Sequence, residues 1–468
     1  MSKTIIIIGA GLAGLSAALQ ATENGCNVKL VSSLPSERAQ SVMAEGGINA
    51  ALNTKDENDS PEEHFTDTIK AACGLADPNA VWGMTQAAPE LVHWLLKLGV
   101  KFNMSGYDDV DLRNFGGQKK KRTAFAQSDT GKQIMTAMID AVRRKEASGM
   151  VERFSHHSFL TLRLCGNICC GCVIRDEYSQ ETVELPGDAV IVATGGMHGL
   201  FGNTTGSLSN TGEVTAELFR LGVPLANGEM IQYHPTTVKC GGKRMLISEA
   251  ARGEGGRLFA MKDGKQWYFM EEKYPELGNL MPRDITAREI WKVSHESEVF
   301  LDMTEISEEI ISNKLSGLAD DCMTYLHKDI RKEPVSVLPG IHYFMGGILV
   351  DEQHRTPIQN LYAAGECCAQ YHGANRLGGN SLLGALYGGR VAAKSACEQA
   401  DVVDLSCATQ IDFPPASQIS EIKQLNKVMQ ETMGVVRNEN MLLNGIQTVQ
   451  ALTGNLPLLG MAVLKSAL

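Results

Sequence analysis

Residues 4–14 read TIIIIGAGLAG, and this stretch decides the fold of the chain. Four consecutive isoleucines predict a buried strand, and three glycines at G-x-G-x-x-G spacing follow where that strand ends. The alanine- and leucine-rich residues after Gly14 predict a helix that ends near Asn24-Gly25, and residues 27–31 predict a second strand. The result is a βαβ unit whose glycines let the pyrophosphate of a dinucleotide approach the helix N-terminus.

Two later segments predict further strands of the same sheet. Residues 188–196 contain the buried run AVIVA followed by TGG, and residues 360–366 lead from NLYAA into a glycine turn with an acidic residue. Strands far apart in sequence can join one sheet, so the interval predicts an inserted domain. From about Gln418 the pattern is helical. The fold class is α/β, with a Rossmann-like domain over 1–227 and 339–405, an inserted α+β capping domain over 228–338 and a short helical region over 406–468.

The end of the second predicted strand lacks the acidic residue that usually accepts the ribose hydroxyls of NAD. That position reads Val31-Ser32-Ser33. The fingerprint therefore predicts a dinucleotide but argues against a plain NAD site.

The composition limits the partners. The chain has 468 residues, and its net charge of -11 opposes nonspecific attraction to nucleic acid or to an anionic membrane. An anionic substrate would therefore need a local cluster of cations. Apart from the glycine-rich N-terminal run, no stretch approaches the length of a membrane-spanning helix, so we expect no direct membrane insertion. Twelve cysteines without regular spacing and no recognisable export signal favour reduced thiols in a cytoplasmic protein.

Three further features have an ordinary interpretation. Four cysteines at positions 165, 169, 170 and 172 cross a predicted hairpin, where alternate residues face opposite sides, so small apolar packing is favoured over a metal site. The basic run Lys119–Arg122 is interpreted as a solvated loop near the pocket mouth, with steering of an anion as the alternative. His198 and His327, which stand outside any motif, are interpreted as satisfied surface or core residues.

Seven motifs in order carry a resemblance to a known family. The chain resembles the flavoprotein subunits of fumarate reductase and succinate dehydrogenase, with L-aspartate oxidase as a close relative. The motifs are Ala44-Glu45-Gly46-Gly47-Ile48, Phe115-Gly116-Gly117, His234-Pro235-Thr236, Ser248-Glu249 with Arg252-Gly253-Glu254-Gly255-Gly256, Arg283-Asp284, His342-Tyr343-Phe344-Met345-Gly346-Gly347 and Gly373-Ala374-Asn375-Arg376-Leu377-Gly378-Gly379-Asn380-Ser381-Leu382.

The resemblance implies FAD as the cofactor, and no metal site is expected. Membrane-bound members attach FAD through a histidine at the position that Gln40 occupies here, and because an amide cannot form that bond, noncovalent FAD is expected. Glu366 is expected on the sugar-like chain of the flavin, and Ser381-Leu382 near its ring system. The residues expected to bind the cofactor are Gly9, Gly11, Gly14, Ser32, Gly46, Gly47, Ala193, Thr194, Gly195, Glu366, Ser381 and Leu382.

The resemblance also implies a small dicarboxylate substrate. Arg376 and His342 are expected to bind one carboxylate, since an Arg fork matches a carboxylate, and His234 and Ser248 the other. Phe115 is expected to form a wall of this pocket. Fumarate reductases tend to carry Glu at the position of Glu45, where succinate dehydrogenases carry Gln, so reduction of fumarate to succinate is the favoured direction.

The expected reaction passes a hydride from flavin N5 to one olefinic carbon while the other carbon is protonated. Arg283 is expected to donate that proton, helped by the positive charge of Arg252 and by the high basicity of a carbanion. Glu249 and Arg252 are expected to return a proton to Arg283. The catalytic set is therefore Arg283, Glu249 and Arg252.

Departures from the family pattern leave alternatives open. Typical members continue beyond the position of Leu468 with a region that helps to dock an iron–sulfur subunit, so the helical region here is a truncated one. The expected partner is an electron-donor protein, possibly an iron–sulfur subunit, which could also hold the protein at the membrane surface. Aspartate oxidation or reduction of another α,β-unsaturated acid is one alternative function. A flavin-binding electron-transfer module without catalysis is the other.

Overall fold

The first strand lies at the centre of a parallel sheet, as the glycine-rich stretch predicts. The computed structural model describes residues 2–106, 109–400, 411, 413 and 418–468. Strand β1 (Thr4–Ile8) pairs in parallel with β2 (Asn27–Ser32) and with β10 (Ala189–Val192). With β6 (Val151–Ser155) and β20 (Leu361–Ala363) they form one sheet in the order β20-β10-β1-β2-β6. The predicted α/β class and the convergence of the three distant strands are confirmed.

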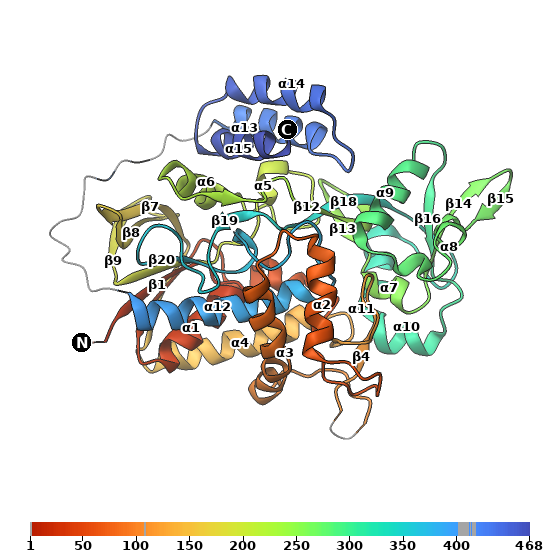
Figure 1. Cartoon of the computed structure of the whole chain (residues 1–468), viewed down its shortest axis with the longest axis horizontal. Helices are drawn as coiled ribbons and strands as arrows, with labels where there is room; N and C mark the ends of the chain where they lie inside the picture. Colours follow the sequence, from red (N-terminus) through yellow and green to blue (C-terminus); the bar gives the residue numbers. More distant parts are fainter. Residues whose placement is uncertain (1, 107–108, 401–410, 412, 414–417) are drawn as a thin grey trace.

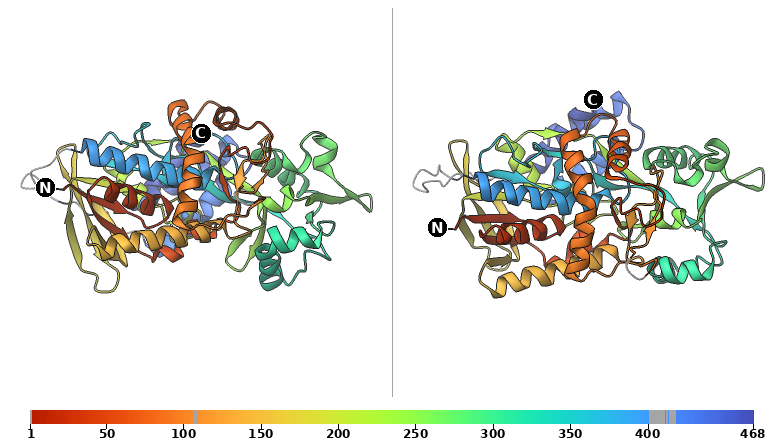
Figure 2. Two further views of the ribbon diagram at one scale, coloured as in Figure 1. Left: turned by 90° about the horizontal axis from the view of Figure 1, so that it is seen from below. Right: turned by 60° about the horizontal axis from the view of Figure 1, so that its bottom comes forward.

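The isoleucine run is continuous because β1 is buried on both faces. Ile5 and Ile7 pack into one hydrophobic cluster, and Ile6 and Ile8 into another on the opposite face. Parallel strands covered on both sides have this uniformly apolar sequence. Helices α1 (Leu12–Glu23), α4 (Thr130–Ala147) and α12 (Asn380–Gln399) cover the first face, with α1 between the other two (Figure 2).

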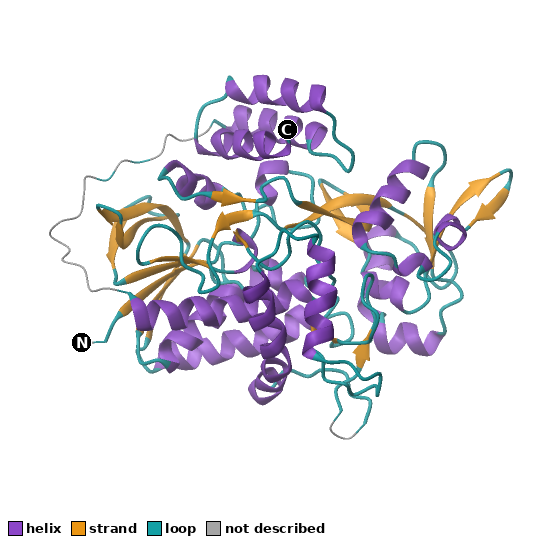
Figure 3. Ribbon diagram, in the orientation of Figure 1, coloured by secondary structure: helices purple, strands orange, loops and turns teal. Residues whose placement is uncertain are grey.

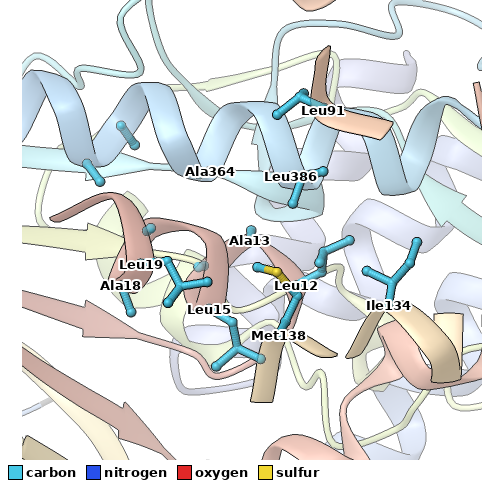
Figure 4. Close-up of a cluster of buried hydrophobic side chains, with 14 of the residues drawn as sticks. Leu12, Ala13, Leu15, Ala18, Leu19, Leu91, Ile134, Met138, Ala364 and Leu386 are labelled. Atoms are coloured by element: carbon cyan, nitrogen blue, oxygen red, sulfur yellow. The ribbon is translucent and has the colours of Figure 1, made fainter. Parts of the chain in front are cut away.

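The core under these helices contains small and branched side chains. Figure 4 shows Leu12, Leu15 and Leu19 of α1 beside Met138 of α4 and Leu386 of α12. Alanines on α1 and α12 let these two helices approach closely, and Gly389 lies so near α1 that an added Cβ would stand 2.3 Å from the backbone oxygen of Ala13. Helices α2 (Pro61–Ala72) and α3 (Pro78–Leu98) lie in front of this layer in Figure 1.

An antiparallel sheet covers the other face of the parallel sheet. It consists of β7 (His157–Cys165), β8 (Ile168–Asp176) and β9 (Thr182–Pro186). Cys169 and Cys172 of β8 pack with Ile6 and Ile8 in the apolar cluster. Within the described residues, no group of three or more His, Cys, Asp or Glu side chains could hold a metal ion. The expectation of reduced thiols is wrong at Cys165, which is disulfide-bonded.

Long antiparallel strands connect the nucleotide-binding region to a second region. Strand β12 (Ile231–Cys240) pairs with β13 (Lys243–Leu246) and with β18 (Leu338–Phe344). Beyond them lies a sheet in the order β15-β14-β16-β17 with its own hydrophobic cluster (Figure 3). The predicted limits of the capping domain, 228–338, stay a prediction. Its elements are α7 (Glu249–Gly253), β14 (Arg257–Lys262), β15 (Lys265–Trp267), α8 (Phe269–Lys273), α9 (Arg283–Val293), β16 (Val299–Asp302), α10 (Glu308–Lys314), α11 (Ser316–Asp321), the π-helical turn η4 (Cys322–Leu326) and β17 (Val335–Ser336).

Three helices at the C-terminal end form a separate layer at the top of Figure 1: α13 (Ile419–Thr432), α14 (Glu439–Gln450) and α15 (Asn455–Ala467). They pack on α5 (His198–Phe201) and α6 (Glu213–Arg220). The carboxylate of Glu217 on α6 is buried and accepts hydrogen bonds from Arg220, Asn455 and Thr161. The predicted helices after Gln418 are confirmed, while most of residues 406–417 lie outside the described residues.

The remaining elements are short. They are the strands β3 (Ile48–Asn49), β4 (Leu112–Arg113), β5 (Thr123–Ala124), β11 (Leu225–Ala226), β19 (Gly347–Leu349) and β21 (Cys368–Ala369), and the 3-10 turns η1 (Ser36–Arg38), η2 (Gln40–Met43), η3 (Gly278–Leu280) and η5 (Gly365–Cys367). Of the helices in the part of the chain that the structure describes, none combines the length and the apolarity that crossing a bilayer requires.

Candidate active site

A cavity of about 560 Å³ opens where the carboxyl ends of the parallel strands meet β12 and β18. Ligands of open α/β sheets bind at this position, outside the ends of the strands. Most of the residues predicted from the sequence line this one cavity. From the cofactor set these are Gly9, Gly11, Ser32, Gly46, Gly47, Ala193, Thr194, Gly195, Glu366, Ser381 and Leu382, and from the substrate and catalytic sets Glu45, Phe115, His234, Ser248, Glu249, Arg283, His342 and Arg376.

The glycine-rich turn leaves room for a pyrophosphate. Gly9 has a φ of +114°, and an added Cβ would stand 2.2 Å from the backbone oxygen of Ala193. Gly14 does not line the cavity; its added Cβ would stand 1.8 Å from the oxygen of Gly9, so it permits the contact between α1 and β1. At Gly11 the nearest atom would be 3.6 Å away, which leaves the helix N-terminus open toward the cavity. The first turn of α1 contains no acidic side chain, which suits an anionic phosphate.

One buried polar atom without a hydrogen-bond partner among the described residues lies at the end of β2, where the adenosine part would bind. The hydroxyl of Ser32 is buried and makes no hydrogen bond within the described residues. This hydroxyl at the end of β2 can bond a ribose hydroxyl in place of the missing acidic side chain. The glycine cradle, the helix N-terminus and the Ser32 hydroxyl together fit a dinucleotide such as FAD.

Gln40 forms a hydrogen bond within the protein. Its Oε1 accepts from the backbone N–H of Ser207 at 2.7 Å, and both residues line the cavity. The amide therefore anchors the loop at residues 204–207 to η2.

Arg283 and Arg252 both face Glu249. Ser248 caps α7, so Glu249 and Arg252 lie one helical turn apart and face the same side. Arg283 donates to Glu249 Oε2 from Nη2 at 2.6 Å and from Nε at 2.8 Å, while Arg252 Nη2 lies 3.5 Å from Oε1. Burial raises the pKa of Glu249, but the two guanidinium groups outweigh it and hold the pKa below its ordinary value. Glu249 is therefore ionised at neutral pH. Arg252 is buried and does not line the cavity.

Arg376 is a buried cation without an acidic partner within 4 Å in the described structure. Its guanidinium lies 4.3 Å from the centre of the Tyr343 ring, Nη1 donates to the oxygen of Leu377 at 3.3 Å, and Nε has no hydrogen-bond partner among the described residues. Burial and the charge of Arg283 lower the pKa of Arg376 to about 9, so it stays protonated at neutral pH. An unpaired buried charge is costly, which indicates that an anion binds here.

Two histidines lie side by side in the cavity wall, with their ring centres 5.1 Å apart. His342 is held through Nδ1 by the hydroxyl of Thr205 at 2.8 Å. Nδ1 of His234 lies within 3.4 Å of three groups of Thr236, whereas its Nε2 is buried and has no hydrogen-bond partner in the part of the chain described. Burial, together with the neighbouring guanidinium of Arg283, holds the pKa of both rings well below the ordinary value. Both are therefore neutral donors or acceptors at pH 7.

Glu45 lies near Ser248 at the cavity. Burial and the neighbouring carboxylate of Asp321 raise the pKa of Glu45 to about 8, although the hydroxyl of Ser248 partly offsets them. The side chain is therefore mostly a neutral acid at pH 7. Three guanidinium groups, from Arg252, Arg283 and Arg376, thus interact with the ionised carboxylate of Glu249. In this cluster the guanidinium groups outnumber the carboxylate, which favours an anionic ligand.

Two predictions for side chains outside the motifs are wrong. The prediction of a solvated loop for the basic run Lys119–Arg122 fails at Arg122, which is fully buried. Its guanidinium lies 2.8 Å from the carboxylate of Asp59 and 3.0 Å from that of Asp67. Lys120 and Lys121 of the run pair with glutamates of the 57–63 segment, so these acids cancel the charge that steering would need. His198 is not a satisfied core residue, because its buried Nε2 makes no hydrogen bond within the described residues.

The sequence motifs do not identify two residues of the site, Gln232 and Thr205. Gln232 accepts from Arg283 Nη1 at 3.0 Å and donates to the backbone oxygen of Arg376 at 2.7 Å, so it joins the two arginines. It lies two residues before His234 in β12, and the alternation of side chains along a strand could have indicated it. Thr205 has no such signal, because it reaches His342 from a loop far away in sequence.

Comparison with known proteins supports the interpretation of the cavity as a dinucleotide site. A family model described as an FAD binding domain matches residues 4–382. The chain is 43% identical to the succinate dehydrogenase flavoprotein subunit of Bacillus subtilis, over 86% of this chain and 70% of that protein. It is 32% identical to the L-aspartate oxidase of Streptomyces coelicolor, over 97% and 80%. A solved structure of the E. coli quinol fumarate reductase superposes with a TM-score of 0.87 at 26% identity, covering all of this chain and 87% of that one.

Proposed function

Because this chain belongs to the family of FAD-dependent flavoproteins of fumarate reductase and succinate dehydrogenase, we propose that it reduces fumarate to succinate. It is an FAD-dependent oxidoreductase, which confirms the cofactor expected from the motifs. One observation carries the choice of substrate. The guanidinium groups of Arg252 and Arg283 beside Glu249, together with the buried Arg376, suit a substrate with two carboxylates.

The residues for the cofactor divide between two ends of the cavity. Gly9 and Gly11 would hold the pyrophosphate, Ser32 the ribose and Glu366 the sugar-like chain, with Ser381 and Leu382 beside the ring system. FAD, when bound, supplies the two-electron chemistry of the reaction.

The substrate is held by charge and by shape. Arg376 and His342 bind one carboxylate, and His234 Nε2 with the Ser248 hydroxyl binds the other. Phe115 is 1% exposed and forms an apolar wall beside Gly46, which excludes water from the reacting carbons.

Arg283 delivers the proton to the substrate carbon. Glu249 Oε2 fixes Nε and Nη2, and Gln232 fixes Nη1, so the plane of the guanidinium has one orientation. Guanidinium is a weak acid, but a carbon next to a carboxylate that gains an electron pair is a far stronger base than neutral guanidine. Glu249 lies between Arg283 and Arg252, so it is placed to pass a proton back to Arg283 afterwards.

Succinate oxidation at the same site is a second candidate. The observation that favours it is the 43% identity to a succinate dehydrogenase flavoprotein subunit. Glu45 at the cavity, where succinate dehydrogenases tend to carry Gln, favours reduction instead. The electron-donor partner is part of the proposal, with an iron–sulfur subunit as the first candidate.

One assay separates the candidates. Purified protein loaded with FAD is given reduced viologen with fumarate, and an oxidised dye with succinate or with aspartate. Faster turnover of fumarate than of succinate supports the proposal. Turnover of aspartate alone, or no turnover of any of the three acids, overturns it.

A further inference from the structure

His198 forms a buried contact with Glu366 on the cofactor side of the cavity. Its side chain is 1% exposed, on the short helix α5 below the C-terminal helices (Figure 1). Nε2 lies 3.5 Å from Glu366 Oε1, and the backbone N–H of Phe344 donates to the same oxygen at 3.1 Å. The ring edge packs against Phe344, with the ring centres 5.0 Å apart. Glu366 is thus held through a single oxygen.

The hydroxyl of Thr204 determines which ring nitrogen of His198 carries the proton. It lies 3.0 Å from Nδ1 and accepts the backbone N–H of Gly206 at 3.2 Å. Thr204 is fully buried, and Nδ1 is the acceptor in the described structure that its own proton can reach. The hydroxyl therefore donates to Nδ1, and the ring proton is on Nε2, which faces Glu366.

The backbone at two glycines packs closely against both side chains. A Cβ at Gly206 would stand 2.2 Å from the His198 ring, and a Cβ at Gly196 would stand 2.6 Å from Glu366 Oε1. Glycine at both positions permits the ring and the carboxylate to meet. Glu366 Oε2 makes no hydrogen bond within the described residues, and Glu366 lines the cavity.

We propose that His198 is a positioning residue for the cofactor: the N–H at Nε2 attracts one oxygen of Glu366 across 3.5 Å and so leaves the other oxygen for a hydroxyl of the sugar-like chain of FAD. The inference rests on the role proposed for Glu366. Thr204 fixes the ring, and the hydroxyl of the next residue, Thr205, lies 2.8 Å from Nδ1 of His342. One loop therefore positions a cofactor-side histidine and a substrate-side histidine.

Two substitutions of His198 separate a positional role from a structural one. A glutamine places its side-chain N–H₂ near the position of Nε2, whereas an asparagine reaches only the position of Nδ1. We expect His198→Gln to bind FAD within about threefold of the wild type and His198→Asn to bind about tenfold more weakly, as the loss of one polar contact with a carboxylate predicts. The dissociation constants come from titrating apoprotein with FAD and measuring flavin fluorescence. His354→Asn, at another fully buried histidine that does not line the cavity, is the control.

A double-mutant cycle tests the route through Glu366. In the Glu366→Gln background, His198→Asn should change FAD binding by less than about twofold, because the two residues act as a unit. Equal binding of FAD by the wild type and His198→Asn, or effects that multiply in the double variant, would overturn the inference. These titrations do not use substrate. An enzyme that binds FAD as expected but turns over no dicarboxylate would refute the proposed function, and the test of His198 by FAD titration would still be valid.

Discussion

Nε and Nη2 of Arg283 both donate to one oxygen of Glu249, Oε2, at 2.8 and 2.6 Å. The other oxygen of Glu249 accepts the backbone N–H of Gly116 at 2.9 Å and faces Arg252. A single carboxylate thus fixes the orientation of one guanidinium and lies within reach of a second. Arg283 is also the first residue of α9, where the helix dipole disfavours a cation, so its position is explained by the cavity rather than by the helix.

Arg283→Ala should abolish the reduction of fumarate and leave FAD bound. The proton donor is lost, and general acid catalysis contributes roughly 10²–10⁴-fold, so we expect a fall in kcat of about 10³-fold or more. Stopped-flow kinetics with reduced viologen measures the effect. Arg288→Ala, on the same helix but half exposed, is the matched control. Activity of Arg283→Ala within tenfold of the wild type would refute the assignment.

Arg376→Met should weaken substrate binding without destabilising the substrate-free protein. Methionine keeps the apolar packing on Tyr343 but removes a buried cation that has no acidic partner within the described residues. We expect KM for fumarate to rise by about 100-fold or more, as the loss of a charged hydrogen bond predicts. Denaturant unfolding with and without succinate gives the second readout. Stabilisation by succinate that is equal in the wild type and the variant would contradict this prediction.

Glu45 should make the protein less stable as the pH rises. Burial and Asp321 raise the pKa of its carboxyl from 4.5 to about 8 in the folded state. The unfolded chain releases this proton near pH 4.5, whereas the folded protein keeps it up to about pH 8. The protonated carboxyl therefore contributes its full stabilisation below pH 4.5, and this contribution is lost as the pH rises to about 8.

Glu45→Gln should remove that loss, because an amide resembles the neutral acid in shape and does not ionise. The free energy of unfolding of the variant, compared with that of the wild type, should rise between pH 5 and pH 8 and stay level above. Urea unfolding at several pH values measures it, with Glu37→Gln on the surface as the control. A pH-independent difference between wild type and Glu45→Gln would show that the carboxyl ionises normally.

FAD should be released completely when the protein is denatured with acid. Gln40 stands at the position of the linking histidine, and its amide is already bonded to the backbone of Ser207. After precipitation, all flavin absorbance should be in the supernatant. Flavin that stays with the pellet through washing in denaturant would disprove noncovalent binding.

Arg122→Ala should destabilise the fold strongly, because it leaves Asp59 and Asp67 buried without their partner. Breaking a buried ion pair costs about 3–5 kcal/mol, which should appear as a lower denaturation midpoint in urea. Lys119→Ala is the control, since Lys119 is exposed on the same basic run. Equal midpoints for the two variants would mean that Arg122 is not held as described.

The sequence predicted the elements that bind the cofactor better than it predicted the partners of the charged and polar side chains. Glycines at fixed spacing and an isoleucine run identify β1, the turn and α1, because both signals depend on neighbouring residues. Four motif residues, Arg283, Arg376, His234 and His342, line one cavity, whereas Arg252 lies behind it. The roles of Thr205 and His198 depend on contacts between segments more than a hundred residues apart, and nothing local in the chain shows them; Gln232 also reaches Arg283 from another element of the chain.

Local spacing and the hydrophobic pattern were thus enough to predict the α/β class and the dinucleotide fingerprint, and the family motifs implied FAD. Only the tertiary structure decided that Arg122 is a buried structural residue, that Arg376 has no acidic partner in the described chain and that His198 faces Glu366. The physical reason is that the charge state and role of a side chain depend on burial and on partners, and folding brings those partners from distant parts of the chain.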